Sequence, residues 1–594
     1  MTNKKPKKRR KTSQPGSFIE ARALLVIAAL GLLFSLVLVR SIQLTVFPTE
    51  LNSLKKIARG QYTNNIKLAP FRGSILDRRG EPLAISIRRP SLVVNPRVFE
   101  PTHWQVSRLA KFLKIKRSRI RKMAEKSASF AWLKRQVDPG DAQKALSLDI
   151  EGLYMIKEPT RYYPGDQTLA HLLGFVGIDN QGLTGLEKMF DRDLKGEPIK
   201  VTANKDALGN VIYNDATDAK SQKTGHNVHL TIDRAIQEIV EEELSQGVKN
   251  AKAKKGYAVV ADPHTGKILA VANYPTFNLN RRQTRNKNNQ RNAALKDLFE
   301  PGSITKPFVL ARAIDKKALR ATTLLNCENG VYRIGRNKIH DTHKASILSA
   351  AQAVVESSNI CAFKIAKKLG QEETYKALSA FGVGSDRLSL GINGEAKGRI
   401  ATPGDWRPIR FATISFGQGF LTSAIEMVSA MSVIANGGLL WRPSIVEKIQ
   451  SSDNYVIKNS PPQLIERVIK PETAKTMRKI LQKVVEDKDG TGENAKSDLY
   501  TTAGKTGTAQ KVDPGIKGYS SEKFLTSFLG FSPVKDPHLV VLVAIDEPTI
   551  KPYYGGTWAA PVFRKIVDRS LKYLNVAPQK TTVAGKQKNL GSIH

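Results

Sequence analysis

The sequence predicts an α+β protein with one apolar helix at its N-terminus, and three observations indicate this. The run Ala23 to Val39 contains no charged residue. A strand hairpin is expected at Tyr257 to Ala272, and strands return at Phe524 to Phe531 and at Leu539 to Ile545. Mainly helical sequence occupies roughly 303 to 440 between them. A sheet assembled from both ends of a domain, with helices inserted between, is an α+β layered architecture.

The size and composition predict several folded domains with a strongly basic surface. At 594 residues the chain is long enough for two or three domains. Hydrophobic residues make up 41% and charged residues 25%, as is ordinary for a globular protein. The net charge of +41 favours an anionic partner such as a membrane surface, a wall polymer or nucleic acid, or else a merely solvated basic surface. We expect no nucleic acid, because no zinc-finger spacing, RNP signature or basic zipper accompanies the charge.

The N-terminal apolar run predicts a single membrane crossing. Its seventeen residues (Ala23 to Val39) span about 25 Å as a helix, short of a ~30 Å hydrocarbon core. Arg22 and Arg40 can snorkel, and Ser41 to Phe47 extends the run, so one crossing is feasible. A cleaved signal peptide fits poorly, because no small-residue cleavage site follows. The basic residues at 4–11 place the N-terminus in the cytoplasm and the rest of the chain outside, in the periplasm of a bacterium.

Breaks in composition divide the chain into five predicted parts. Around Asp215 to Gly225 the sequence turns polar and small, which indicates a domain boundary. The last ~17 residues are polar and are expected to fray. The predicted parts are a cytoplasmic basic tail (1–22), a transmembrane helix (23–44), an N-terminal outer domain (45–222), a second domain (223–577) and a flexible tail (578–594).

The only two cysteines, Cys327 and Cys361, exclude a fold built on disulfides. They could pair in an oxidising compartment, although Cys361 is expected to face the core of an apolar helix. The sequence leaves this open.

Three short motifs in the second domain carry the chemistry. They are Ser303-Ile304-Thr305-Lys306, Ser357-Ser358-Asn359 and Lys505-Thr506-Gly507. Together they supply a serine nucleophile, a candidate neutral lysine, a polar relay and a second cation with hydroxyls. That set suits acyl transfer through a serine ester without histidine.

Local context separates Ser303 from rival Ser-x-x-Lys matches at Ser53 and Ser520. Pro307 is harmless only in the first turn of a helix, so the helix should begin at or just before Ser303. Ser303 then lies where backbone N–H groups point, with Lys306 one turn on and on the same side. Lys306 must be neutral to accept the serine proton, and burial together with the nearby Lys505 would lower its pKa.

The other two motifs are expected to line the same groove. Ser357 to Asn359 interrupts an apolar helical stretch, so we expect a short link between two helices. Lys505 has small residues on both sides, as an edge strand beside a groove needs, and Gly507 would let substrate backbone approach closely. The N–H groups of Ser303 and Thr508 would form an oxyanion hole.

No metal site is expected from the histidines. His340 and His343 are three residues apart, but no cysteine or carboxylate cluster accompanies them. We interpret this stretch as a surface loop, and predict neither a metal nor an organic cofactor.

With the three motifs in this order, the chain resembles the penicillin-binding proteins, the serine D,D-transpeptidases that cross-link peptidoglycan. Further stretches resemble the non-catalytic pedestal of the class B group: Arg72-Gly73 to Leu83-Ala84, Arg161-Tyr162-Tyr163-Pro164 and Gly182 to Glu187. Residues 48 to 220 are too few for the glycosyltransferase domain of class A members and lack its acidic Glu-Asp signature. The resemblance implies an elongated pedestal at 45–222, serving dimerisation or interaction. It also implies a transpeptidase domain at 223–577, with a central antiparallel sheet and a helical subdomain.

Within class B, the resemblance is to the division-specific septal enzyme (FtsI type). The stretches that carry it are Phe416-Gly417-Gln418-Gly419, Lys505 to Gln510, Tyr553-Tyr554-Gly555-Gly556 and Ala560 to Phe563. Where this chain has Thr305, family members usually carry a small apolar residue. We expect the threonine to be tolerated.

The resemblance implies roles for the site residues. Ser303 attacks the penultimate D-alanine carbonyl of a stem peptide, Lys306 is the base and Ser357 helps to relay the proton to the leaving amine. Further residues bind the substrate: Asn359, Lys505, Thr506, Gly507, Thr508, Tyr553 and Tyr554. An amine from a neighbouring stem peptide then takes the acyl group, and β-lactams would acylate Ser303 and remain there.

The resemblance also implies partners: the stem peptides, β-lactams, and a septal glycan polymerase with other division proteins. Several rival interpretations remain. A β-lactamase or β-lactam sensor could carry the same motifs, but both usually lack a large pedestal. The chain could also be an elongation-type class B transpeptidase. Another alternative is a β-lactam-binding division scaffold with little catalysis.

Overall fold

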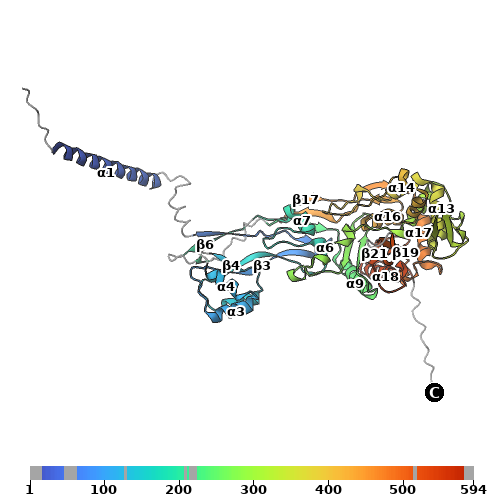
Figure 1. Cartoon of the computed structure of the whole chain (residues 1–594), viewed down its shortest axis with the longest axis horizontal. Helices are drawn as coiled ribbons and strands as arrows, with labels where there is room; N and C mark the ends of the chain where they lie inside the picture. The colour runs from blue at the N-terminus through green and yellow to red at the C-terminus, as the bar shows by residue number, and fades with distance from the viewer. Residues whose placement is uncertain are drawn as a thin grey trace, which may run out of the picture. The chain divides into compact units, whose positions relative to one another are not determined.

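The computed structural model of the chain describes residues 16–45, 63–125, 130–197, 199–205, 211–212, 224–512 and 518–580 (Figure 1). The chain forms two compact units, each described by itself below. The first comprises Met1–Leu68, Arg89–Glu158 and Ile199–Ser221, and the second comprises Ala69–Arg88, Pro159–Pro198 and Gln222–His594. The basic cluster at 4–11, the domain boundary at 222–223 and most of the tail after 578 lie outside the described residues. The five predicted parts therefore stay a prediction.

Helix α1 (Gly16–Thr45) contains the apolar run found in the sequence. Its segment Ile19–Gln43 has 25 residues, a mean hydropathy of 2.6 and no buried surface. At 1.5 Å per residue such a helix is about 37 Å long, enough to cross a hydrocarbon core of about 30 Å. The helix begins before residue 23, so the candidate span is longer than the sequence predicted.

The first unit has a small core of its own. Apolar side chains of α3, α4 and α5 pack with Leu92, Val94 and Leu133. Among the described residues of 103–146, the chain forms three short helices, with one strand between the second and the third. Outside α1, the elements of this unit are β1 (Thr63–Leu68), α3 (His103–Leu113), α4 (Arg117–Ala124), β4 (Ala131–Lys134), α5 (Pro139–Leu146), β6 (Ile199–Lys205) and β7 (Val211–Ile212). Strands β3 (Pro82–Val94) and β5 (Leu153–Tyr162) have residues in both units.

The second unit is built on a five-stranded antiparallel sheet in the order β10-β9-β21-β20-β19. All eight residues of the central strand β21 are buried, because layers of helices cover both faces. Apolar residues of α9 and α18 pack on one face, and those of α11, α16 and α17 pack on the other. The α+β prediction is confirmed. The strands are β9 (Lys255–Ala261), β10 (Ile268–Tyr274), β19 (Ala503–Val512), β20 (Tyr519–Ser532) and β21 (Leu539–Asp546), and the covering helices are α9 (Arg234–Asn250), α11 (Lys306–Asp315), α16 (Ala424–Ala435), α17 (Pro471–Glu486) and α18 (Gly555–Tyr573).

The inserted region between β10 and β19 is mainly helical, as predicted, but it also contains short strands. Ile347–Ser349 is strand β14, so the apolar stretch expected to be helical from Ile347 begins its helix only at Ala350. The elements are α10 (Ala293–Lys296), β11 (Leu324–Asn326), β12 (Val331–Ile334), β13 (Asn337–His340), α12 (Ala350–Val355), α13 (Asn359–Leu369), α14 (Gln371–Ala380), α15 (Pro408–Ser415), β15 (Leu439–Trp441), β16 (Val446–Gln450), β17 (Val456–Asn459) and β18 (Leu464–Arg467).

A disulfide joins Cys327 to Cys361 across this region, with their Cα atoms 5.2 Å apart. Both residues are fully buried. Cys361 therefore lies in the core, as expected, and also pairs with Cys327. The bond ties the segment after β11 to the first turn of α13. The sequence had left the pairing open.

A buried ion network joins three segments of the second unit, which carry Arg72, Arg161 and Glu187. Arg72 contacts the Glu187 carboxylate at 2.9 Å and Asp191 at 2.6 Å, and Arg161 contacts Glu187 at 2.6 Å. Arg161 also donates to the carbonyl of Gly73 at 2.7 Å. The side chains of Arg72, Arg161 and Glu187 are at most 1% exposed, so each charge depends on the others for compensation. The remaining elements of this part are β2 (Ile75–Leu76), α6 (Ala170–Leu173), α7 (Gly185–Met189), α8 (Asp191–Leu194) and β8 (Asn227–Leu230).

Removal of this network should destabilise the second unit strongly. We expect Glu187→Ala to lower the free energy of unfolding by about 3–5 kcal/mol, because it leaves two guanidinium groups buried without their shared carboxylate. Urea denaturation followed by tryptophan fluorescence measures the change. Glu238→Ala is the matched control, since Glu238 forms an exposed pair with Arg234 and should cost about 0.5 kcal/mol or less. An equal decrease in the free energy of unfolding in Glu187→Ala and Glu238→Ala would contradict the proposed stabilising role of the network.

Candidate active site

Ser303 lies in a 3-10 turn, Gly302–Thr305, that leads directly into α11. Pro307 occupies the first turn of α11, as the sequence predicted. The turn is held by a hydrogen bond from the Gly302 N–H to the Gly417 carbonyl, 2.9 Å long. Gly417 has φ +90°, and a Cβ there would lie 2.0 Å from the Gly302 carbonyl oxygen. Only glycine fits at residue 417, so the Phe416 to Gly419 stretch fixes the serine turn.

Lys306 is almost fully buried, and its ammonium is directed to the second motif. Nζ donates to the Ser357 carbonyl at 2.6 Å, to Ser357 Oγ at 3.2 Å and to Asn359 Oδ1 at 2.8 Å. Burial lowers the pKa of Lys306 to about 7, against the opposing effect of the Asp341 carboxylate. A lysine with this pKa is neutral in a large fraction of molecules at neutral pH and can accept a proton.

The second motif links α12 and α13, as the sequence predicted. Ser357 has φ +64°, and Ser358 caps α13 by accepting from the Cys361 N–H at 3.0 Å. The Asn359 amide is held between two partners: Oδ1 accepts from Lys306, and Nδ2 donates to the His340 carbonyl at 2.9 Å. Both ends of the amide are therefore oriented.

Asp341 supports this link and was not predicted. Its carboxylate accepts from Ser358 Oγ at 2.6 Å, from the Ile360 N–H at 3.0 Å and from the Asn359 N–H. The carboxylate thus binds the N-terminal N–H groups of α13, where the helix dipole favours an anion. A single aspartate far from a motif in sequence carries no signal that could have revealed it.

The third motif lies on β19, the edge strand of the five-stranded sheet, as predicted. Lys505 is fully buried, and its Nζ donates to Thr491 Oγ1 at 3.2 Å and Thr506 Oγ1 at 3.3 Å. Burial, together with the charge of Lys306, lowers the pKa of Lys505 well below its ordinary value. An anion bound beside these hydroxyls would favour the charged ammonium again. Thr491 is a second residue that sequence reasoning missed.

Gly507 is needed for packing rather than for access to the groove. A Cβ there would lie 2.4 Å from Ser527 Oγ and 3.1 Å from both the Pro301 carbonyl oxygen and Ile304 Cγ2. The absence of a side chain at Gly507 therefore lets the serine turn lie directly against β19. This reason differs from the one that the sequence suggested.

Two tyrosines follow β21 at the opening of α18. Tyr554 is half exposed and lines the cleft. Tyr553 is stacked on Phe524, with ring centroids 5.2 Å apart, and Phe524 in turn lines the cleft. The Gly555 N–H donates to Thr508 Oγ1 at 3.2 Å, which ties this segment to β19.

These segments enclose one cleft of about 480 Å³. Ser303 lines it together with Ser357, Asn359, Thr506, Thr508 and Tyr554, whereas Lys306 and Lys505 lie buried beside it. His343, which we interpreted as part of a surface loop, also lines it, as do Glu356 and Gln418. Within the described residues no group of three or more His, Cys, Asp or Glu side chains could hold a metal ion.

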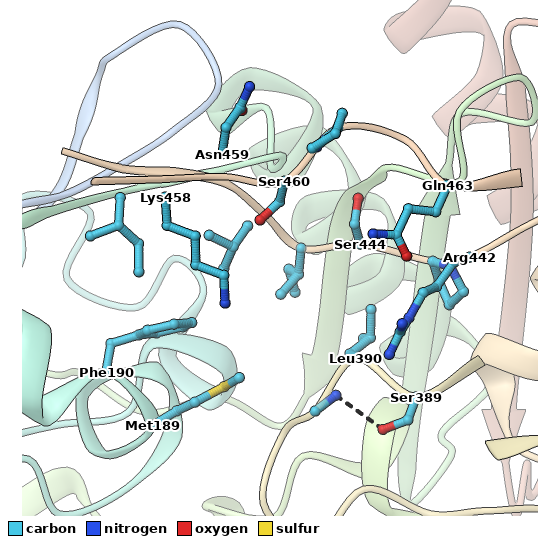
Figure 2. A pocket seen from close by; sticks show the side chains of 16 residues that line it. Met189, Phe190, Ser389, Leu390, Arg442, Ser444, Lys458, Asn459, Ser460 and Gln463 are labelled. Carbon is cyan, nitrogen blue, oxygen red and sulfur yellow. Dashed lines mark hydrogen bonds between the residues drawn. The ribbon is translucent and has the colours of Figure 1, made fainter. Parts of the chain in front are cut away.

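A separate cavity of about 370 Å³ in the second unit contains none of the three motifs. Met189 and Phe190 lie on one side of it, and Ser389 and Arg442 lie on the other (Figure 2). The loop that carries Ser389 is closed by the Gly391 N–H, which donates to Ser389 Oγ at 3.0 Å. The Ser303 cleft, in contrast, is lined by residues of all three motifs, so it is the candidate active site.

Comparisons with known proteins agree with this geometry. Residues 256–568 match the penicillin binding protein transpeptidase domain, and residues 67–230 match the penicillin-binding protein dimerisation domain. The chain is 34% identical to the probable peptidoglycan D,D-transpeptidase PenA of Neisseria meningitidis, covering 95% of this chain and 94% of the relative. It is 32% identical to the peptidoglycan D,D-transpeptidase FtsI of Escherichia coli, covering 88% of this chain and 86% of the relative. It is 33% identical to stage V sporulation protein D of Bacillus subtilis, covering 90% of this chain and 83% of the relative.

Solved structures give the same assignment. Penicillin binding protein 3 of Mycobacterium tuberculosis, crystallised with aztreonam, has a TM-score of 0.67 at 25% identity, covering 86% of this chain and 98% of the other. The matches to both domains, and relatives of about one-third identity over most of the chain, identify the protein as a member of the class B penicillin-binding proteins, with a transpeptidase domain that carries the Ser303 cleft.

Proposed function

We propose that this protein is a peptidoglycan D,D-transpeptidase that cross-links stem peptides through an acyl-enzyme on Ser303. The observation that carries the proposal is the buried Lys306, which has a pKa of about 7 and contacts Ser357 and Asn359 beside the nucleophile. Two relatives whose names describe this activity, PenA and FtsI, each align with most of the chain.

In the first half-reaction, Ser303 Oγ attacks the carbonyl of the penultimate D-alanine while neutral Lys306 accepts the hydroxyl proton. The N–H groups of Ser303 and Thr508 stabilise the oxyanion, and each such donor contributes about 10²–10³ in rate. The C–N bond then breaks. Ser357 helps to pass the proton to the leaving D-alanine nitrogen, and an ester on Ser303 remains.

The remaining site residues hold the substrate. The hydroxyls of Thr506 and Thr508, with the Lys505 ammonium behind them, bind its terminal carboxylate. Asn359 has a second amide hydrogen besides the one donated to His340, and this hydrogen binds a peptide carbonyl of the acyl group. Gly507 keeps the serine turn against β19, and Tyr553 and Tyr554 form an aromatic wall.

In the second half-reaction, an amine from a neighbouring stem peptide attacks the ester. It loses a proton to the Lys306 side of the cleft, and the new amide leaves while Ser303 Oγ regains its proton. No metal or organic cofactor enters these steps. A β-lactam would open on Ser303 in the same way and stay, because its leaving group remains tethered.

We further propose that the enzyme acts at the division septum, anchored in the cytoplasmic membrane by α1. The sequence stretches shared with the septal FtsI type support this role, although identities to FtsI and to a sporulation protein are nearly equal. The basic residues at 4–11 support a cytoplasmic N-terminus. A septal glycan polymerase, engaged through α1 and the pedestal, is the expected partner.

The acyl-enzyme can be tested by intact-mass analysis of the full-length protein in detergent after brief exposure to benzylpenicillin. We expect a lasting adduct of one penicillin in the native protein and none in Ser303→Ala. Ser520→Ala is the matched control and should still form the adduct, because Ser520 lies in a rival Ser-x-x-Lys sequence outside the cleft. An adduct lost within seconds would indicate a β-lactamase. No adduct would refute the proposed chemistry and favour a scaffold.

Acylation should also depend on pH through Lys306. Its pKa of about 7 means that the neutral, proton-accepting form grows as pH rises through 7. The second-order rate constant for benzylpenicillin acylation should therefore rise between pH 5.5 and 8 and level off, with an apparent pKa near 7. Stopped-flow measurement of acylation gives the profile. A rate that is flat across this range would exclude Lys306 as the base.

Asp341 is expected to act as a positioning residue through the second motif. Asp341→Asn removes the anion that opposes the lowering of the Lys306 pKa, so the midpoint of the pH profile should move below 7. The weaker capping of α13 should also lower the acylation rate constant by about tenfold. Asp386→Asn is the control, because Asp386 is largely exposed and pairs only with Lys397 in the described structure. An unchanged midpoint in Asp341→Asn would contradict this role.

A further inference from the structure

Two helices of the first unit, α3 and α4, carry a dense cluster of positive charge. Residues 101–124 include eight Lys and Arg residues and no Asp or Glu. All eight side chains are exposed, and none of them forms an ion pair with a carboxylate in the part of the chain that the structure describes. We call this cluster the α3–α4 basic surface; its cations are Arg108, Lys111, Lys114, Lys116, Arg117, Arg119, Arg121 and Lys122.

The cations of the two helices belong to one surface. Helices α3 and α4 lie side by side and pack on the same apolar core (Figure 1). Their apolar side chains point into that core, so the charged ones are left on the outer side. A contact of 3.2 Å between His103 Nδ1 and Arg121 Nη2 joins the start of α3 to α4.

A ninth cation shows how closely these charges are gathered. Lys134 of β4 donates to the Leu113 carbonyl at the end of α3. Burial lowers the pKa of Lys134, and the charges of Lys114 and Arg119 lower it further, against the opposing effect of the Asp141 carboxylate. Repulsion between like charges opposes the compact state. A bound anion would relieve this repulsion.

An exposed tryptophan lies on the same surface. Trp104 is 57% exposed, and the Arg108 guanidinium lies over its ring, 5.3 Å from the centroid. Spacings of four and three residues place Trp104, Arg108 and Lys111 on one face of α3. Tryptophan is enriched at membrane interfaces, where its ring lies among the lipid headgroups, and cations on the same face attract anionic lipids. This combination favours a lipid surface over a wholly polar anionic polymer.

The N-terminal helix keeps the first unit close to a bilayer. Helix α1 and strand β1 belong to the same unit as α3 and α4. From Thr45, where α1 ends, to Thr63, where β1 begins, the chain advances by eighteen residues, which span at most about 65 Å. The unit therefore remains within reach of the bilayer that α1 enters. This step rests on the proposed anchoring by α1 and not on the chemistry at Ser303.

We propose that the α3–α4 basic surface binds the anionic phospholipid headgroups of the membrane in which α1 is anchored. Its Lys and Arg side chains pair with lipid phosphates, and Trp104 enters the interfacial region. Each cation near an anionic bilayer contributes about fivefold in affinity. The first unit then has two attachments to the membrane, a spanning helix and a docked surface, and the second depends on lipid composition.

The test measures the accessibility of lysines in the full-length protein, reconstituted into lipid nanodiscs. One kind of disc contains phosphatidylcholine alone, and the other contains phosphatidylglycerol as well. Brief acetylation with an N-hydroxysuccinimide ester, followed by peptide mass spectrometry, gives a rate constant for each lysine. The reporters are Lys111, Lys114, Lys116 and Lys122, and the internal controls are two exposed lysines of the second unit, Lys338 and Lys488.

Phosphatidylglycerol should slow the acetylation of the four reporter lysines by about fivefold or more, because an ammonium paired with a lipid phosphate is covered and stays protonated. The two control lysines should react at the same rate in both kinds of disc. Raising the salt concentration from about 0.1 M to 1 M shortens the Debye length from about 10 Å to 3 Å and should remove the protection.

Arginine variants test the surface while its lysines remain as reporters. Arg117→Gln combined with Arg119→Gln removes two cations, which should weaken docking about 25-fold and reduce the protection to below about twofold. Arg333→Gln combined with Arg336→Gln is the matched control, because both arginines are exposed in the second unit. This control should keep the full protection of the reporter lysines.

Four results would overturn the inference. Equal acetylation of the reporters in both kinds of disc would leave the surface merely solvated. Equal slowing of Lys338 and Lys488 would show a general attraction of the basic chain to anionic lipid. Slowing by soluble polyglycerol phosphate, but not by phosphatidylglycerol, would make a wall polymer the partner. Protein that enters neither kind of disc would refute the proposed anchoring, and the inference with it.

Discussion

The active site depends on backbone contacts that leave no room for a side chain. A Cβ at Gly417 would lie 2.0 Å from the Gly302 carbonyl oxygen, and one at Gly555 would lie 2.5 Å from the Gly507 carbonyl oxygen. Gly507 itself lies against Pro301 and Ser527. These contacts bring the serine turn, the loop after α15, the edge strand and the start of α18 together. These four segments carry many of the residues that line the cleft.

Because these segments are so closely packed, the side chains of Lys306 and Lys505 are removed from water. Lys306 and Lys505 are each at most 1% exposed, and burial lowers the pKa of both. Their partners are hydroxyls, a carbonyl and an amide, which orient the amines without compensating their charge. One amine can then serve as a base. The other is prepared for an anion that would restore its charge.

The sequence predicted much of the fold and the site, because those features depend on local patterns. The link at Ser357, the edge strand at Lys505 and the sheet formed from both ends of a domain follow from turn residues and apolar periodicity. The proline position predicted a helix from about Ser303, whereas Ser303 lies in a 3-10 turn and α11 begins at Lys306. The strand β14 was missed because two apolar residues and a serine directly before a helix have no distinct period.

The residues that the sequence did not reveal contact the site from other segments of the chain. Asp341 and Thr491 each contact the site from a segment whose local sequence resembles an ordinary loop or turn. The pairing of Cys327 with Cys361 likewise depends on the distance between their Cα atoms, 5.2 Å, which the 34 residues between them do not determine. Gly507 was identified for a different reason, because its neighbours come from β20 and from the turn that carries Ser303.

By itself, then, the sequence determined the order and kind of the chemical groups: serine and threonine hydroxyls, an asparagine amide and two lysine amines. Those identities are covalent facts that survive any arrangement. Only the tertiary structure decided which groups lie beside one another and which are kept from water. Lys306, whose pKa burial lowers to about 7, differs from an exposed lysine in its surroundings rather than in its formula, and those surroundings come from distant parts of the chain.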